Sequence, residues 1–125
     1  LLLRVKDMLE DSRKPMVQAD ATIQTVIFEI SEKRLGVTAV IENDKIIGII
    51  TDGDIRRMLS KTETITGITA RDIMTINPKM IQSNDMVVKA LNIMEDFSIT
   101  QLIVSDDSIY KGVIHLHDIL KEGIV

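Results

Sequence analysis

The sequence predicts an α+β fold in which a unit of strand, helix, strand, strand and helix occurs twice. The chain of 125 residues matches itself when it is shifted by 64 positions, the distance from Gly48 to Gly112. Each copy also places apolar residues at helical spacing ahead of two β-branched runs that flank a turn. One such unit has too small a core to be stable alone. We therefore expect the two copies to pack around a pseudo-twofold axis as one compact module.

The self-similarity extends over both predicted helices and both predicted strand pairs. Residues that coincide under the shift are Met16 with Met80, Ile23 with Val87, Ile30 with Met94, Gly48 with Gly112 and Asp54 with Asp118. Matching Thr38 with Thr100 requires a local change of length, because the first lies eight residues beyond Ile30 and the second six beyond Met94. We therefore expect one loop to be two residues shorter in the second copy and the next loop two residues longer.

The individual elements follow from local patterns. Apolar residues at i, i+3, i+4 and i+7 from Ile23 to Ile30 predict a helix with one core-facing side. Asp20, and Asn84 in the second copy, are residue types that cap helix N-termini, so we expect them to be the caps. The predicted hairpins join 37–41 to 46–50 and 100–104 to 109–114, and short helices at 53–60 and 116–122 close the units.

The predicted organisation is a first repeat at 1–60, a linker at 61–69 and a second repeat at 70–125. The first repeat begins with a lead-in helix at 2–9, which 70–75 repeats. The linker is rich in threonine and contains Gly67. Because the chain starts at Leu1 without a methionine, we expect it to be a segment of a longer protein.

Composition narrows the classes of partner. The net charge is −4 and aromatic residues make up 2%, which argues against nucleic acid as a partner because phosphate binding needs basic surface and unpaired bases need stacking platforms. No apolar run approaches the roughly 20 residues of a membrane-spanning helix. The chain has no cysteine and therefore no disulfide framework or thiolate site. We expect a cytoplasmic protein that is not bound to a membrane.

Thr51 and Asp54 are the first candidate ligand-binding residues. They lie where a predicted strand gives way to a helix, and free N–H groups at a helix N-terminus favour phosphate. The threonine hydroxyl can donate to a phosphate while the carboxylate accepts from ribose hydroxyls. Alternatively, Thr51 or Asp52 caps the helix and Asp54 complements the helix dipole. Arg57, with Arg56 beside it, could bind a phosphate or carboxylate, or could simply be solvated.

The second copy has His115 at the position of Thr51, followed by His117 and Asp118. Residues two apart share one face of a strand, so these three side chains could gather around a metal ion, but no fourth ligand is evident. We favour His115 as a hydrogen-bond donor to an anionic group. A histidine that caps the last helix is the competing interpretation. We predict no metal site.

Thr38 and Thr100 complete the set of candidate ligand-binding residues because they begin the middle strands, where plain β-propensity explains them equally well. The sequence contains no Ser-His-Asp or Cys-His order, no Gly-rich P-loop and no HExxH motif. We therefore predict no catalytic residue in this chain.

Two motifs resemble those of CBS repeats: DIMTINP at 72–78 and GIITDGD at 48–54. The resemblance covers essentially the whole chain. GIITDGDIRR at 48–57, GVIHLHDIL at 112–120 and ITQLIV at 99–104 further resemble the CBS pair at the C-terminus of D-arabinose 5-phosphate isomerases. The second copy departs from the T-x-x-D pattern at His115.

The resemblance implies a ligand-sensing regulatory module rather than an enzyme. In that family the pair follows an N-terminal sugar-isomerase domain that makes the precursor of Kdo, an acidic sugar of lipopolysaccharide. The implied effector is a nucleotide or nucleotide-sugar bound between the repeats, either CMP-Kdo or AMP or ATP, with no required cofactor. The module is expected to be a homodimer. The alternative is a structural oligomerisation module whose clefts stay empty.

Overall fold

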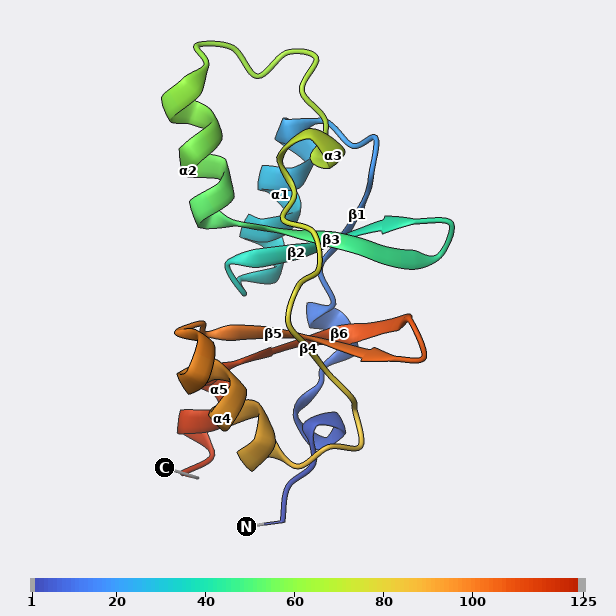
Figure 1. The fold of residues 1–125 in the computed structure, drawn as a ribbon, viewed down its shortest axis with the longest axis vertical. Coiled ribbons are helices and arrows are strands. Elements are labelled where there is room, and N and C mark those ends of the chain that lie inside the picture. Colours follow the sequence, from blue (N-terminus) through green and yellow to red (C-terminus); the bar gives the residue numbers. More distant parts are fainter. Residues whose placement is uncertain (1, 124–125) are drawn as a thin grey trace. The chain divides into compact units, whose positions relative to one another are not determined.

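The computed structural model describes residues 2–123. It contains two three-stranded sheets, ordered β1-β2-β3 and β4-β5-β6. In each sheet the first strand pairs parallel with the middle strand, which pairs antiparallel with the third. Within each half, the helices cover one face of the sheet (Figure 1). The α+β prediction with two strand–helix–strand–strand–helix units is confirmed.

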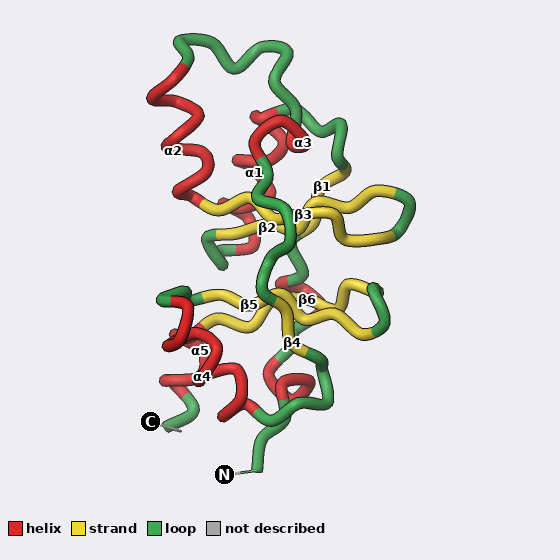
Figure 2. The backbone as a smooth tube through the Cα atoms, in the orientation of Figure 1, coloured by secondary structure: helices red, strands yellow, loops and turns green. Residues whose placement is uncertain are grey.

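The chain forms two compact units, and we call residues 15–78 the middle unit. The terminal unit combines the chain before residue 15 with the chain from residue 79 onward. Both contain a hairpin flanked by helices (Figure 2). The middle unit comprises β1 (Met16–Gln18), α1 (Ile23–Lys33), β2 (Val37–Glu42), β3 (Lys45–Thr51), α2 (Asp52–Lys61) and α3 (Ala70–Ile73). The terminal unit comprises 3-10 helices at Val5–Met8 and Asp11–Arg13, then β4 (Met80–Ile81), α4 (Val87–Phe97), β5 (Gln101–Asp106), β6 (Ile109–His115) and α5 (Leu116–Lys121).

The compact units cross the predicted repeat boundaries because each lead-in segment packs with the other repeat. Val5 is fully buried in the core of the terminal unit, and its N–H donates to the carbonyl of Asp85 at 2.9 Å. Ala70 is fully buried in the middle unit, and its N–H donates to the carbonyl of Ala21 at 2.9 Å. The first lead-in is a single 3-10 turn rather than the predicted helix over 2–9. The repeat boundaries themselves stay a prediction.

Strand register corrects the expected loop lengths. Val37 pairs with Thr51 and Gln101 pairs with His115, so the shift of 64 holds without a gap through both hairpins. The two sheets even share the position of a register irregularity, after Val40 and after Val104. Pairing and burial fix register in a sheet, and residue identity does not.

As a result, Thr38 and Thr100 are not equivalent, and the predicted match between them is wrong. Thr38 corresponds to Leu102, and both side chains are buried. Thr100 precedes β5 and corresponds to Gly36, because their carbonyls accept from the first residues of α5 and α2 respectively.

The predicted helix caps are also corrected. Thr22 caps α1, and its Oγ1 accepts from the N–H of Thr25 at 3.2 Å, whereas Asp20 lies in the preceding turn. Met86 occupies the equivalent position at α4 and makes no side-chain cap, and Asn84 precedes it. Thr22 forms an isolated bridge with Thr69, so the chain stays extended for two residues beyond Asp20 before the helix begins.

Each unit has its own apolar core between sheet and helices. The core of the middle unit consists of Val17, Ala19, Val26, Ile30, Val40, Ile50 and Ala70. The core of the terminal unit consists of Val5, Ile81, Val87, Ala90, Met94, Leu102, Val104, Ile114 and Ile119.

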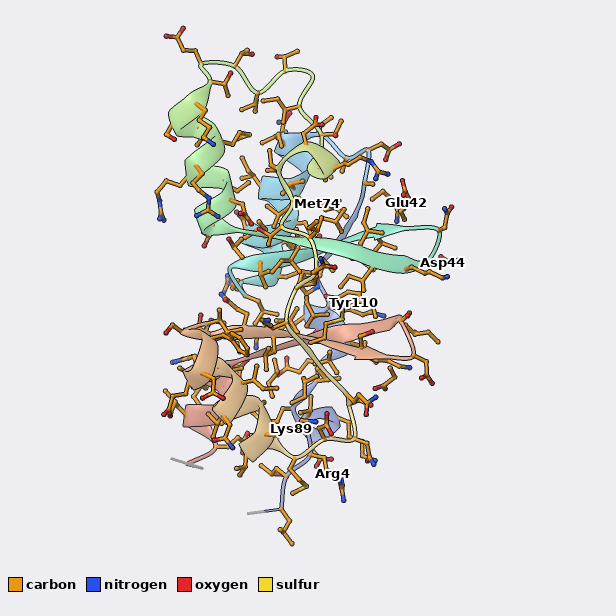
Figure 3. All side chains as sticks on the ribbon, in the orientation of Figure 1. Arg4, Glu42, Asp44, Met74, Lys89 and Tyr110 are labelled. Atoms are coloured by element: carbon orange, nitrogen blue, oxygen red, sulfur yellow. The ribbon has the colours of Figure 1, made fainter. Side chains whose placement is uncertain are left out.

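Both hairpin tips have positive φ at two residues, Asn43 and Asp44 in the first, which suits the twist of a two-residue turn. Figure 3 shows Asp44 at the first tip. No helix within residues 2–123 is long and apolar enough to cross a membrane.

We predict that Gly48→Ala destabilises the chain. A Cβ at this position in β3 would lie 2.8 Å from Met74 Sδ and 2.9 Å from the carbonyl oxygen of Thr75. The segment after α3 passes close to β3 here (Figure 3), because Thr75 and Ile49 exchange two backbone hydrogen bonds. The carbonyl cannot withdraw without breaking them, so we expect a loss of about 1–3 kcal/mol in unfolding free energy, measured by urea denaturation.

Gly53→Ala is the matched control. Its Cβ would come no closer than 3.4 Å to Arg57 Nη1, and alanine favours the helix. This variant should be neutral or slightly more stable. Equal stability of the two variants would contradict the close approach at Gly48.

Candidate functional site

Thr51 ends β3 and caps α2 through a reciprocal pair of hydrogen bonds. Its Oγ1 accepts from the N–H of Asp54 at 3.2 Å, and its own N–H donates to Asp54 Oδ2 at 2.9 Å. A capping box of this kind satisfies two backbone donors that the helix cannot pair internally. The structural interpretation of Thr51 is therefore confirmed, and a ligand-binding role stays a prediction.

The carboxylate of Asp54 is buried and fully hydrogen-bonded. Its side chain is 6% exposed. Besides the N–H of Thr51, Oδ2 accepts from Thr51 Oγ1 at 3.2 Å, while Oδ1 accepts from Thr75 Oγ1 at 3.1 Å and from Arg57 Nη2 at 2.5 Å. An ionised carboxylate offers about four lone-pair sites. Asp54 therefore has no spare acceptor, and another donor can bind only by replacing a present one.

A groove of about 440 Å³ opens beside this carboxylate, within the middle unit. Its walls come from α2, from α3 and from the connection between them. The apolar part consists of Met58, Ile68 and Ile73, and the polar part consists of Asp54, Arg57, Lys61, Thr62 and Asp72. An apolar surface with several polar groups directed at it is a common form of small-molecule site.

The equivalent junction in the terminal unit is built differently. His115 caps α5, and its Nδ1 accepts from the N–H of His117 at 2.9 Å. Asp118 does not close a capping box with His115. Instead Asp118 Oδ1 lies 3.5 Å from Arg13 Nη1, which belongs to the 3-10 helix Asp11–Arg13 just after the first lead-in segment. The capping interpretation of His115 is confirmed.

His117 does not share a strand face with His115. The strand ends at His115, and His117 is the second residue of α5 with an exposed side chain. The side chains around them do not collect a ligand set, since residues 2–123 contain no group of three His, Cys, Asp or Glu residues placed to hold a metal ion. The geometric argument for a shared face is therefore wrong.

Burial lowers the pKa of His115 below its ordinary value of 6.5. Desolvation is the largest cause, and the neighbouring charges of His117 and Arg13 act in the same direction. The carboxylate of Asp118 opposes them and raises the pKa. The neutral imidazole suits the cap, because Nδ1 must keep its lone pair to accept from His117.

The predicted site residues fall into separate places. Thr51, Asp54 and Arg57 come together in the middle unit, and His115, His117 and Asp118 in the terminal unit. Thr38 is fully buried in β2, where its Oγ1 donates to the carbonyl of Ala39 at 3.1 Å. Thr100 is exposed.

Sequence reasoning missed Thr75 and Arg13. Thr75 is the last residue of the second lead-in segment and Arg13 lies just after the first. Each contacts the aspartate of a strand–helix junction. The signal that could have found them is the repetition of the lead-in itself, since a repeated segment is expected to have a repeated contact.

The CBS domain family model matches residues 5–61 and 70–124. Over 127 aligned positions the chain is 37% identical to arabinose 5-phosphate isomerase KdsD of Yersinia pestis, which covers all of this chain and 39% of that relative. The chain therefore spans about two-fifths of the length of the curated relatives it matches.

Solved structures agree on the fold. The CBS domain NE2398 has a TM-score of 0.87 at 19% identity, with all of both chains covered. The CBS domain pair of protein MJ0100, in complex with 5′-methylthioadenosine and S-adenosyl-L-methionine, has a TM-score of 0.84 at 22% identity and covers 97% of this chain and 99% of its own.

We predict that folding stability falls as the pH is lowered from about 7.5 to about 5.5, partly through His115. Because its pKa is lowered in the folded state, the unfolded chain takes up this proton first, so unfolding is favoured as the pH falls below the ordinary value of 6.5. His115→Asn keeps a good capping side chain that does not titrate, so its stability should depend less on pH. Urea denaturation at several pH values measures the difference.

His117→Asn is the control for this effect. The substitution removes the neighbouring exposed imidazole, and most of the pH dependence should persist, because desolvation is the largest cause of the lowered pKa of His115. A His115→Asn variant with the full pH dependence of the wild type would contradict the role of His115.

We also predict that Asp54→Ala and Asp118→Ala differ in stability. Loss of the Asp54 carboxylate leaves the donors of Thr51, Thr75 and Arg57 without their acceptor, which should cost about 2–4 kcal/mol. Loss of Asp118 removes one long, partly exposed ion pair and should cost less than about 1 kcal/mol. Chemical denaturation of both variants tests this, and equal losses would show that the two acids have the same structural role.

Proposed function

The chain belongs to the CBS-domain family, and on this premise we propose that it is the ligand-sensing regulatory part of a D-arabinose 5-phosphate isomerase of Kdo and lipopolysaccharide biosynthesis. The chain is a CBS pair and not the catalytic part of such a protein. Its match to the isomerase relative spans its whole length and 39% of the relative, which supports an N-terminal sugar-isomerase domain in the parent protein. We also propose that the parent protein is cytoplasmic.

The proposed effector is a nucleotide or nucleotide-sugar. The observation that carries this proposal is a buried carboxylate at a strand–helix junction, Asp54, beside a groove of about 440 Å³. A related CBS pair, that of MJ0100, is in complex with adenosine compounds, which favours AMP or ATP. CMP-Kdo is the other candidate, because an activated end product is a reasonable feedback effector for an enzyme that supplies its precursor.

The proposed roles follow from chemistry at the two junctions. Asp54 would accept from ribose hydroxyls, and Arg57 would contact an anionic group, since guanidinium groups bind phosphate and carboxylate in two-point fashion. His115, with its neutral imidazole, would hydrogen-bond to the ligand beside Asp118. Thr38, Thr51, Thr100 and His117 stay predicted contact residues.

A structural oligomerisation module is the alternative function. The specific observation in its favour is an apolar groove of about 580 Å³ between α4 and α5 of the terminal unit. Val88 and Leu120 line it and expose about half of their surface. In a homodimer such a surface would be covered, so we propose that the chain is dimeric under either function.

We predict that AMP, ATP or CMP-Kdo raises the melting temperature of the chain. A ligand that binds only the folded state at about 100 times its Kd adds about 2.7 kcal/mol of stability. Differential scanning fluorimetry followed by calorimetry measures the shift and the Kd. Asp54→Asn keeps the shape of the side chain but exchanges an acceptor oxygen for a donor, so it should abolish the shift.

Free ribose 5-phosphate is the matched ligand control, because it lacks the base and should produce a much smaller shift. If none of the three nucleotides changes the melting temperature at millimolar concentration, the sensing function is wrong and the oligomerisation module is the better description.

A further inference from the structure

The groove beside Asp54 continues along α2, away from the strand–helix junction. Its base is apolar, formed by Met58, Ile68 and Ile73. Two cations line it, Arg57 and Lys61, together with the carboxylates of Asp54 and Asp72. Lys61 has no ion-pair partner within residues 2–123, and Arg57 is 65% exposed although it contacts Asp54. Asp54 pairs with Arg57 and Asp72 accepts from Thr69, so Lys61 is the cation that remains for a ligand group that is both anionic and partly apolar.

Helix geometry fixes the spacing along this groove. Asp54, Met58 and Lys61 recur at the spacing of one helix face, so the three lie in a row on α2. Asp54 and Lys61 are seven residues apart, which corresponds to about 10 Å along the helix axis. One end of the row therefore offers a carboxylate and the other end an ammonium group.

Hydrogen bonding at Asp54 links the two ends. All of its acceptor sites are used, and the side chain of Arg57, one of its donors, is 65% exposed. In the bound state that we infer, a ligand hydroxyl that donates to Oδ1 replaces Arg57 Nη2. The released guanidinium then has an unpaired charge, and an anionic group of the same ligand in the groove compensates for it.

We propose that the α2–α3 groove is an anion subsite of the effector site and that the effector is a nucleoside derivative with a phosphate or carboxylate about 10 Å from the hydroxyls that meet Asp54. Arg57 and Lys61 bind the anion, and Met58, Ile68 and Ile73 pack against the adjoining part of the ligand. This inference rests on the proposed function, in which Asp54 accepts from the ligand.

The second repeat lacks the equivalent cation. Under the shift of 64 residues, Lys61 corresponds to Val125, which lies outside the described residues but is apolar by sequence. α5 is also shorter than α2, with six residues against ten. The subsite is therefore specific to one repeat.

Calorimetry with adenosine, AMP and ADP tests the subsite. Lys61→Met should weaken ADP binding about fivefold to tenfold and leave adenosine binding unchanged, because only ADP carries a distant anion. Arg56→Met is the matched control. It removes the same charge from the same helix at a residue that does not line the groove, so it should change neither affinity.

Titration with pyrophosphate tests the anion subsite without depending on nucleoside recognition. In 1H–15N spectra it should shift the amide signals of 57–62 and 68–73, and Lys61→Met should abolish the shifts. If pyrophosphate does so while no nucleoside binds, the anion subsite stands and the proposed nucleotide sensing is wrong.

Other outcomes overturn the subsite. If Lys61→Met and Arg56→Met weaken ADP equally, the effect is one of overall charge. If adenosine and ADP bind alike, and Asp54→Asn weakens both while Lys61→Met weakens neither, sensing stands without the anion subsite. If no nucleoside, nucleotide or pyrophosphate binds, both proposals are wrong.

Discussion

The exchange of the two lead-in segments is the constraint on which the rest of the structure depends. A three-stranded sheet with two helices buries too little apolar surface to be stable, and the core beside each sheet is completed by a residue from elsewhere in the chain. Val5 packs in the apolar core of the terminal unit and Ala70 packs in the core of the middle unit. Both are fully buried. Backbone hydrogen bonds hold the two segments in place.

The exchange of lead-in segments also determines which side chains contact Asp54 and Asp118 at the two strand–helix junctions. After each buried lead-in, the chain runs past the end of the third strand, which brings Thr75 to Asp54 and Arg13 to Asp118. Thr75 additionally pairs with Ile49 through two backbone hydrogen bonds. A ligand that displaced Thr75 from Asp54 would also disturb the packing of the second lead-in segment. Ligand binding at Asp54 and packing of that segment would then be thermodynamically linked.

The two junctions share a backbone plan and differ in chemistry. Thr51 and Asp54 form a capping box, and Thr75 and Arg57 use the remaining acceptor sites of the buried carboxylate. His115 caps with an imidazole of lowered pKa and leaves Asp118 with a single long ion pair. Equivalent positions in the two repeats thus differ. The middle unit has a buried carboxylate with four hydrogen bonds, and the terminal unit has a histidine of lowered pKa beside an aspartate with one long ion pair.

The sequence by itself determined the repeat, the fold class and the position of both junctions, because apolar periodicity and turn residues are local and the shift of 64 residues preserves them. It also identified Thr51 and His115 as possible caps. Only the tertiary structure decided the strand register that separates Thr38 from Thr100, because identity of residue type is weaker than pairing and burial in fixing register. It alone brought Thr75 and Arg13 to the acids, since those contacts span 21 and 105 residues and depend on which unit each lead-in segment completes.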